Sequence, residues 1–514
     1  MASIGGEIRL SEDVTRWGAA EIARRIAARE LTSVNVVEAH IRRIEAINGR
    51  LNALVVPMFA QARAAAKTAD EIQQSGRSLG LLHGVPFTVK ECFHVAGTPA
   101  TIGIERFRRE LSTEDAPLVA RLKQAGGVLL GKTNVPQLML FFETDNPVYG
   151  RTNNPWDEDR SCGGSTGGEA ALIAACGSPL GLGTDLGGSI RQPAHSCGVQ
   201  GFLPTPGRLT TEGMRWNLGN LEAVAVQPGV LARNVADLRL AMSVLCGPPP
   251  VEQKLEGLRI AMWLDDGYFT CSPAIRRVVT EAAAALRERG AVVEPIASPD
   301  AHETIRLFFG FLSADGGANF KELLGDSPRD WRIARLLRLS AVPGWMRPLM
   351  TRFARFRGKS RLAELLEHTG PLEPEGYRKL VVDKDRFVAE FIDRLGLGRF
   401  DAILCPPHSV PALFHGAGDR LPNAASYCFV MNLLGFPCGV VTAGRVRPGE
   451  ESDRPPSRDP CDTAARQVEA NSTGLPVGVQ IAALPHRDDL VLTLLSALES
   501  DFRSQPDFPR LPPI

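Results

Sequence analysis

Apolar residues recur at helical and at strand-like spacing along most of the chain, and the two patterns alternate. Between residues 15 and 80 the spacing predicts helices. One of them begins after the capping pair Thr32-Ser33 and repeats apolar residues at Val36, Val37, Ile41 and Ile44. Residues 84–90 then predict a short strand. After residue 235, we expect helices over 235–245 and 274–289 and strands over 258–263 and 291–295. This alternation predicts an α/β fold with a largely parallel, covered sheet.

A charge-free stretch over residues 421–444 is long enough to span a bilayer. It is interrupted by helix breakers and polar residues, at Pro422, Asn423, Asn432, Gly435 and Pro437. Such residues are unfavourable in a membrane helix. We therefore expect a buried helix near 425–434, a turn at Gly435–Pro437 and a strand over Cys438–Thr442.

The remaining segments complete this pattern. A helix over 118–125 and a strand over 127–131 form one αβ step, and the chain closes with a strand at Pro476–Ile481 and a helix at 488–500. Residues 445–474 are polar and rich in proline, which predicts a surface excursion. The chain has no internal repeat and no linker between equal halves. We expect a helical N-terminal region over 1–80 and one large domain over 81–505.

Composition excludes several classes of protein. The 514 residues contain 58 Lys and Arg against 58 Asp and Glu, so the basic face of a nucleic-acid-binding domain is not expected. The 44% of hydrophobic residues argues against disorder. Ten cysteines are too sparse for a disulfide scaffold, and neither C-x-x-C nor H-E-x-x-H occurs, so we expect no metal and no cofactor. The first residues lack the apolar core of a signal peptide, which favours a cytoplasmic location.

Two motif matches lack the context that their chemistry requires. Residues 126–133 fit the G-x-x-x-x-G-K-T phosphate loop, but the intervening positions are themselves strand-like and Pro136 follows closely. Residues 163–167 fit G-x-S-x-G, but a loop precedes them where a nucleophile elbow needs a strand. A Ser-His triad would draw on His195, His408 or His486, and a lone histidine is more often structural.

The segment CGGSTGGEAALIAACGSPLGLGTDLGGSIR, over 162–191, carries the strongest chemical signal. It holds two glycine-flanked serines, Ser165 and Ser189, on either side of a helix-like run over 169–176. Glycine lets the backbone come close to a reacting group. The run 184–189 can present several unpaired N–H groups on one side, as an oxyanion hole requires. The alternative is that these glycine-rich turns only pack tightly.

This segment resembles the amidase signature family, which are serine hydrolases with a Ser–Ser–Lys triad. The matching residues are Lys90 in GVPFTVKE, Ser165 in GGSTGG and Ser189 in GTDLGGSIR. The resemblance covers residues 35–500 and implies a single α/β domain with a central twisted mixed sheet surrounded by helices. It also implies that Ser189 attacks an amide carbonyl and that Ser165, on a cis peptide bond, relays the proton. Neutral Lys90 would take this proton and return it to the leaving amine.

The same resemblance implies supporting roles. The backbone N–H groups of four residues would bind the oxyanion, and Asp185 and Arg191 would hold the loop; the four are Leu186, Gly187, Gly188 and Ser189. The family usually has a second serine where this chain has Thr166, and we expect the extra methyl group to tune activity. A lysine base needs a pKa well below its usual value of about 10.4, and burial lowers it by up to ~3–5 units. The residues alone leave open that Lys90 is a solvated surface lysine.

Downstream segments resemble the fatty acid amide hydrolase branch of the family, among them LSADGGANF at 312–320 and NLLGFPCGVV at 432–441. The resemblance implies that the substrates are fatty acyl amides or N-acylethanolamines, bound in a long acyl channel. Its candidate lining residues are Met139, Leu140, Phe311 and Leu312.

Residues 331–361 carry nine Arg and Lys and no acidic residue, interleaved with Trp, Leu, Met and Phe. Basic amphipathic helices of this kind lie in membrane interfaces, and the resembling branch has a membrane cap here. The alternative is a solvated helix pair packed on the body. We expect any membrane contact to be peripheral.

Three functions remain open from the sequence. They are a hydrolase of lipid amides, a general aliphatic or aryl acylamidase of the same family, and the amidase subunit of a tRNA-dependent amidotransferase. The basic segment 331–361 favours the first over the third. We expect a small-molecule amide as substrate, no nucleic-acid partner, and a homodimer.

Overall fold

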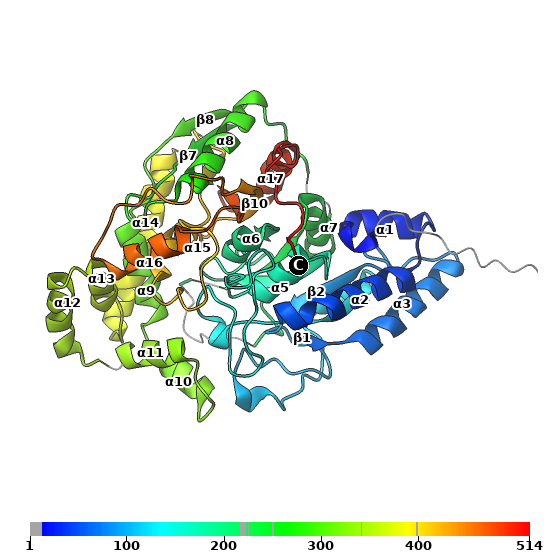
Figure 1. Cartoon of the computed structure of the whole chain (residues 1–514), viewed down its shortest axis with the longest axis horizontal. Coiled ribbons are helices and arrows are strands. Elements are labelled where there is room, and N and C mark those ends of the chain that lie inside the picture. Colours follow the sequence, from blue (N-terminus) through cyan, green and yellow to red (C-terminus); the bar gives the residue numbers. More distant parts are fainter. Residues whose placement is uncertain (1–12, 216–222, 225, 249–250, 341, 397–398) are drawn as a thin grey trace, which may run out of the picture.

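The computed structural model describes residues 13–215, 223–224, 226–248, 251–340, 342–396 and 399–514. Within these residues, eleven strands form one mixed sheet in the order β1-β3-β2-β4-β6-β5-β10-β11-β9-β7-β8. Helices surround the sheet (Figure 1). The strands are β1 (Leu54–Pro57), β2 (Pro86–Lys90), β3 (Val128–Thr133), β4 (Leu180–Asp185), β5 (Gln200–Leu203), β6 (Gln227–Ala232), β7 (Arg259–Met262), β8 (Val292–Pro295), β9 (Ala402–Cys405), β10 (Cys438–Arg445) and β11 (Pro476–Ala483).

The helices of the first half of the chain are α1 (Ala19–Ala27), α2 (Ser33–Leu51), α3 (Phe59–Gln74), α4 (Pro117–Gln124), α5 (Gly167–Ala174), α6 (Arg191–Cys197), α7 (Val235–Cys246) and α8 (Pro273–Glu288). Those of the second half are α9 (Ala301–Leu312), α10 (Ala318–Leu324), α11 (Trp331–Ser340), α12 (Arg347–Phe356), α13 (Ser360–His368), α14 (Pro374–Leu395), α15 (Ser426–Leu434), α16 (Pro460–Glu469) and α17 (Asp488–Arg503). Short 3-10 turns add η1 (Val14–Arg16), η2 (Glu105–Phe107), η3 (Gln137–Met139), η4 (Gly344–Met346) and η5 (Pro422–Ala425).

The helices and strands expected from periodicity are present, and the charge-free stretch is the buried helix α15 followed by β10. In the part of the chain that the structure describes, no helix is both long and apolar enough to cross a bilayer. Several elements were not predicted, among them β4, β9, α6, α9, α10, α13 and α14, together with the four that follow. Strand β1 interrupts a segment expected to be all helical, β5 and β6 lie in or after the glycine-rich segment, and α16 lies inside the proline-rich excursion. Strands β1, β5 and β6 are short, so too few residues carry their alternating period.

The expectation of a largely parallel sheet is wrong, whereas the mixed sheet implied by the resemblance is present. Parallel pairs join β3-β2-β4 and β9-β7-β8. The centre, from β4 through β6, β5, β10 and β11 to β9, is antiparallel. Helix–strand alternation predicts parallel crossovers, but β5 pairs antiparallel with β6 and β10, which the alternation does not foresee.

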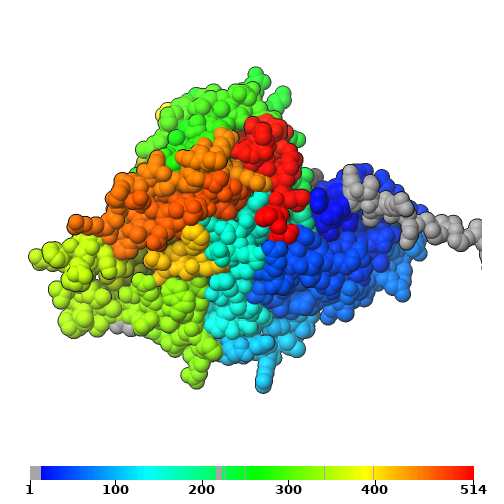
Figure 2. Space-filling view, viewed as in Figure 1, coloured from blue at the N-terminus to red at the C-terminus, as the bar shows by residue number. Residues whose placement is uncertain are grey.

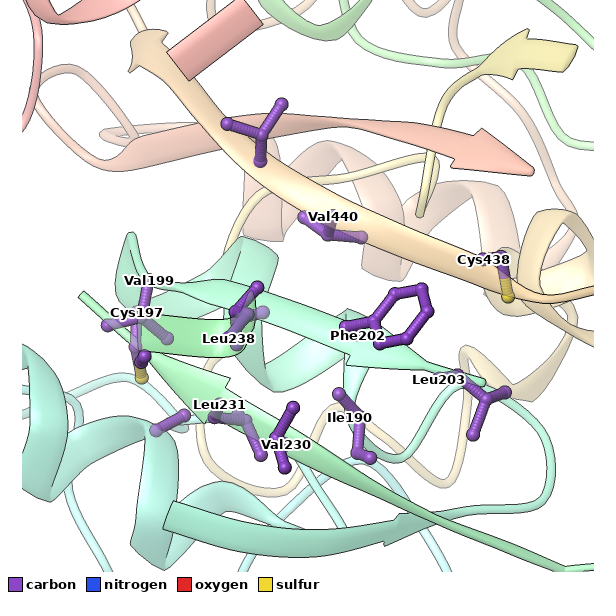
Figure 3. Packing of buried hydrophobic residues seen from close by; sticks show 14 of the residues in the cluster. Ile190, Cys197, Val199, Phe202, Leu203, Val230, Leu231, Leu238, Cys438 and Val440 are labelled. Atoms are coloured by element: carbon purple, nitrogen blue, oxygen red, sulfur yellow. The ribbon is translucent and has the colours of Figure 1, made fainter. Parts of the chain in front are cut away.

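The central strands form the core. All residues of β5, β6 and β11 are buried, as expected for strands covered on both faces. Apolar side chains of β5, β6 and β10 pack together here, including Phe202, Val230 and Val440 (Figure 3). Helix α17 packs on β10 and β11, and α7 packs on β6. This rigid centre supports the loops that follow β2 and β4.

Parallel pairing of β2 and β4 brings the candidate residues to one edge of the sheet. Thr88 lies opposite Gly181, and Val89 lies opposite Leu182. Lys90 is the last residue of β2 and Asp185 is the last residue of β4, so both lie where these neighbouring strands end. Ser165 and Ser189 each lie two residues before a helix, α5 and α6 respectively.

Helices α1–α3 and helices α10–α13 lie at opposite ends of the molecule (Figure 1). The yellow-green surface of the second group forms one end of the space-filling view (Figure 2). This group includes the basic amphipathic segment, which folds as α11, η4 and α12.

Phe202→Ala should lower the free energy of unfolding by ~3–5 kcal/mol, because it leaves a cavity between β5, β6 and β10. Urea unfolding followed by circular dichroism measures this change. The matched control is Phe356→Ala, since Phe356 is 85% exposed; we expect it to change stability by no more than ~0.5 kcal/mol. An equal effect of the two variants would contradict this assignment of the core.

Candidate active site

Lys90 is buried among hydroxyl groups at the end of β2. Its side chain is 0% exposed, which excludes the alternative of a solvated surface lysine. Its Nζ lies 2.7 Å from Ser165 Oγ, 3.0 Å from Thr166 Oγ1 and 2.8 Å from Thr184 Oγ1. Lys90 and Ser165, which the family resemblance pairs, are therefore in direct contact in the fold.

When Lys90 is neutral, the hydrogen bonds with its threonine neighbours leave the lone pair of Nζ free. Thr166 Oγ1 donates its only hydrogen to the Thr184 carbonyl at 3.0 Å, so toward Lys90 it accepts. A neutral amine has two N–H donors, and these are satisfied by Thr166 and Thr184. Its lone pair then faces Ser165 and can accept the hydroxyl proton.

Desolvation is what makes a neutral Lys90 accessible near neutral pH. Burial lowers the pKa of Lys90 to about 8, and the charges of Cys92, Asp185 and Glu169 act in the opposite direction. Because the neutral amine is the form that accepts a proton, this pKa lets the group act as a base in weakly alkaline solution.

Ser165 is held between close backbone contacts. It follows a cis peptide bond from Gly164. Gly164 donates its N–H to Gln192 Oε1 at 3.2 Å, and a Cβ at this glycine would come 2.6 Å from the Phe141 carbonyl oxygen. The adjacent Thr166 places its methyl group against Gly183, where a Cβ would come 2.5 Å from it. The extra methyl of the threonine is thus accommodated by a strand residue that lacks a side chain.

Ser189 lies beside Ser165 through the backbone. Its carbonyl accepts the Thr166 N–H at 3.0 Å, and its side chain is partly exposed. Among the described residues the Ser189 hydroxyl has no hydrogen-bond partner. The side-chain hydrogen bonds therefore join Lys90 to Ser165 and, among the described residues, do not extend to the Ser189 hydroxyl.

Three of the four expected oxyanion donors are unpaired. The N–H groups of Leu186, Gly187 and Ser189 have no acceptor within the described part of the chain. The fourth, that of Gly188, donates to Asp185 Oδ1 at 2.7 Å. Its role is to satisfy a buried carboxylate, because that group requires donors in the absence of water. The structure thus leaves Leu186, Gly187 and Ser189 free for an oxyanion.

Asp185 and Arg191 form a fully buried ion pair beneath this loop. The distance from Arg191 Nη2 to Asp185 Oδ1 is 3.0 Å, and both side chains are 0% exposed. Burial alone raises the pKa of Asp185, but the Arg191 guanidinium and the N–H groups of Ile190 and Gly188 outweigh it and hold the pKa at about 2. The guanidinium also donates to Gln480 Oε1 at 2.8 Å. The pair ties the loop to β11.

An apolar cavity of about 150 Å³ opens between α9, α11 and α13. Of the four candidate substrate-binding residues, Leu312 lines it. Met139 and Leu140 are buried just before Phe141, which does line it, and Phe311 packs on Tyr377 with ring centroids 5.8 Å apart. Other lining residues are Phe309, Phe320, Leu336, Leu337, Leu339, Leu365 and Leu366.

Aromatic rings connect this cavity with the oxyanion loop. Phe308 stacks on Phe429 at a centroid distance of 4.0 Å, and Phe309 meets Phe429 edge-on at 5.6 Å. A Cβ on Gly187 would lie 2.5 Å from the Phe308 ring. An apolar surface formed by these rings therefore leads from Gly187 toward the cavity.

The discounted motifs have other roles. In the phosphate-loop match, residues 128–133 form strand β3, so no glycine loop is present there. His195 and His408 are buried and bond to the Val410 carbonyl, and in the described residues neither ring bonds to Ser165 or Ser189.

Several site residues were not singled out from the sequence. Thr184 stands in the quoted GTD run, so its position next to Asp185 was a usable signal. Gln480, Asn432 and Phe429 come from segments more than 230 residues beyond Asp185, and only the fold places them here.

A family model described as Amidase matches residues 35–492. Fatty-acid amide hydrolase 1 of Sus scrofa is 34% identical over 454 residues, which are 82% of this chain and 76% of the relative. Indoleacetamide hydrolase of Bradyrhizobium diazoefficiens is 37% identical over 303 residues, which are 56% of this chain and 57% of the relative. The glutamyl-tRNA(Gln) amidotransferase of Streptomyces avermitilis has a subunit that is 34% identical over 333 residues, covering 61% of this chain and 65% of the relative.

Among solved structures, a fatty acid amide hydrolase superposes with a TM-score of 0.82 at 24% identity, covering 96% of this chain and 86% of that chain. A crystal structure of an amidase superposes with a TM-score of 0.75 at 25% identity, covering 95% of this chain and all of the other, 100%. Both superpositions show that this chain has the same fold as these two structures.

Proposed function

The chain belongs to the amidase signature family of hydrolases, and we propose that it cleaves fatty acyl amides or N-acylethanolamines through Ser189, Ser165 and Lys90. The observation that carries the catalytic part is the 2.7 Å contact between buried Lys90 Nζ and Ser165 Oγ. The alternatives are an acylamidase acting on short or aryl amides and an amidotransferase subunit.

In this mechanism Ser189 Oγ attacks the amide carbonyl carbon. Its proton passes to Ser165 as the Ser165 proton passes to the lone pair of Lys90. The developing oxyanion accepts hydrogen bonds from the N–H groups of Leu186, Gly187 and Ser189. The ammonium then returns a proton through Ser165 to the leaving nitrogen, and the C–N bond breaks. The resulting acyl ester on Ser189 is hydrolysed by water in the same way.

An apolar acyl group is supported by what surrounds the loop. Phe308 and Phe429 lie beside Gly187, and the cavity beyond them is lined mainly by Phe and Leu. Burying one methylene there contributes about 0.8 kcal/mol. A short polar amide would leave this surface without a partner.

Peripheral membrane contact is supported by the exposed face of η4 and α12. Four large apolar side chains project there, and the exposed fractions are 79% for Trp345, 69% for Leu349, 61% for Phe353 and 85% for Phe356. Arginines flank them, which suits an anionic lipid surface. Helix α11, which precedes η4 in the chain, lines the apolar cavity. The exposed apolar face and the cavity thus lie on consecutive elements of the chain, which supports entry of a lipid amide from a bilayer.

Ser189→Ala should abolish formation of the acyl-enzyme, and Lys90→Met should lower kcat/KM by ~10²–10⁴-fold, as expected for loss of a general base. In the unaltered enzyme kcat/KM should rise as the pH rises through about 8, because the neutral form of Lys90 is the base. Mass spectrometry of the trapped enzyme and a pH series measure these effects. A Lys90→Met enzyme with unaltered kcat/KM would remove the base assignment.

Hydrolysis of saturated acyl amides of increasing length tests the substrate class. We expect kcat/KM to rise by up to about fourfold per added methylene until the cavity is filled. Leu336→Glu, which places a carboxylate in the cavity wall, should flatten the series. Val382→Glu is the control, since Val382 is 63% exposed on α14. A flat series in the unaltered enzyme favours the acylamidase alternative, and activity that requires added subunits favours the amidotransferase.

The combined change Trp345→Ser, Phe353→Ser and Phe356→Ser should reduce cosedimentation with vesicles of phosphatidylglycerol and phosphatidylcholine. Each apolar side chain removed takes away buried area at the interface. Val382→Ser serves as the control for an exposed apolar residue elsewhere. Equal sedimentation of the two variants would rule out a membrane role for this face.

A further inference from the structure

A buried carboxyl group that the proposed proton relay does not use lies close to Lys90. Glu169 is on α5, is 0% exposed, and has no cation within ion-pair distance in the residues that the structure covers. A buried carboxyl without a cation is costly. Its presence at this position therefore calls for a physical explanation.

The carboxyl group is held by the strands on either side of it. Glu169 Oε2 accepts from Thr88 Oγ1 at 2.6 Å, and Oε1 accepts from Thr133 Oγ1 at 2.9 Å. Thr88 shares a face of β2 with Lys90, and Thr133 lies opposite Lys90 on β3. At Gly181 of β4 a Cβ would come 2.2 Å from Oε2, so the strand offers bare backbone to the carboxyl.

These contacts favour the charged form. Each hydroxyl group donates its one hydrogen, and a carboxylate accepts both. Burial outweighs the hydrogen bonds from Thr88 and Thr133 and the charge of Lys90 and raises the pKa of Glu169 to about 8, so Glu169 is protonated near pH 7 and ionised above about pH 8. The charge on Glu169 is thus coupled to the charge on Lys90.

The other acidic groups near Lys90 are already accounted for. Burial raises the pKa of the Cys92 thiol to about 11, so that group is still neutral just above pH 8, where Glu169 is ionised. Asp185 is matched by Arg191. Of the acidic groups that act on Lys90, Glu169 is the one whose charge no other cation offsets.

The remaining titratable groups on elements packed against α5 do not compete. Burial lowers the pKa of His40 on α2 to about 4 and that of His195 on α6 to about 3, so both rings are neutral. Lys132 on β3 donates to the Pro99 carbonyl, and its charge acts on Glu91. Strands β1 and β6 carry no titratable side chain.

We propose that Glu169 is a positioning residue for the proton on Lys90, whose carboxylate is the counter-charge of the ammonium that forms when Lys90 takes the proton of Ser165. This inference rests on the proposed role of Lys90 as base. Above about pH 8, where Lys90 is neutral and Glu169 is ionised, the N–H bond forms at Lys90 as the Ser165 O–H bond breaks, and the proton stays on Lys90 rather than on Glu169. Its charge stabilises the product of the proton transfer and opposes the effect of desolvation on Lys90.

The test is Glu169→Gln, which keeps the shape and removes the charge. The carbon NMR signal of Lys90 Cε, assigned by its loss in Lys90→Met, should titrate about one pH unit lower than in the unaltered protein. The rising limb of kcat/KM against pH should move down by the same amount, because the neutral base is reached earlier. Its plateau should fall by roughly tenfold, because a weaker base takes the proton less readily. KM should stay the same.

Two further variants separate charge from structure. Asp237→Asn removes another carboxyl that is 0% exposed, but one that bonds to the Ala20 N–H, and it should leave the Lys90 titration in place. Thr133→Val keeps Glu169 but removes one of its donors, and should move the titration in the same direction by less. If the Glu169→Gln protein does not fold, Thr133→Val still tests whether Glu169 influences the Lys90 titration.

An unmoved Lys90 signal in both Glu169→Gln and Thr133→Val overturns the inference, as does an equal shift in Asp237→Asn. The NMR measurement does not need a turnover assay. Failure of the proposed function, seen as no amide hydrolysis by the unaltered enzyme, is therefore distinct from failure of this inference.

Discussion

The structure depends on the burial of one amine, Lys90, among hydroxyl groups at an edge of the sheet where two parallel strands end. A lysine is costly to bury as a cation. Here, three hydroxyl oxygens within 3.0 Å of Nζ satisfy the amine, and desolvation brings its pKa close to neutral pH. The same desolvation that makes the site expensive for stability is what makes an amine usable as a base.

Charge is balanced group by group around this amine. Asp185 and Arg191 neutralise each other under the oxyanion loop, and this pair takes up one of the four N–H groups of that loop, from Gly188. Glu169 has hydroxyl donors but no cation of its own. A loop with three unpaired N–H groups can then respond to a charge that appears only during the reaction.

In this region the glycines mainly allow neighbouring atoms to approach the backbone closely. Gly164, Gly181 and Gly183 leave space for a carbonyl oxygen, a carboxyl group and a methyl group respectively. At Gly188 the backbone φ is +113°, a conformation that disfavours other residues. The glycine-rich segment therefore packs tightly and also leaves three N–H groups of the loop without an acceptor among the described residues.

The sequence alone determined many of the amphipathic helices and apolar strands, and a local motif pointed to Lys90, Ser165 and Ser189 as candidates, of which the fold brings Lys90 and Ser165 into contact. These depend on residues close together in the chain, so their periods and spacing carry the information. Tertiary structure decided which N–H groups of the loop 186–189 stay unpaired among the described residues. It also decided that β5 and β6 make the centre of the sheet antiparallel, and it brought Phe429 and Gln480 next to the site. It also showed that Leu312 lines the cavity while Phe311 packs on Tyr377. Such contacts join residues hundreds of positions apart, and their register is set by packing of the whole core, which no local pattern records.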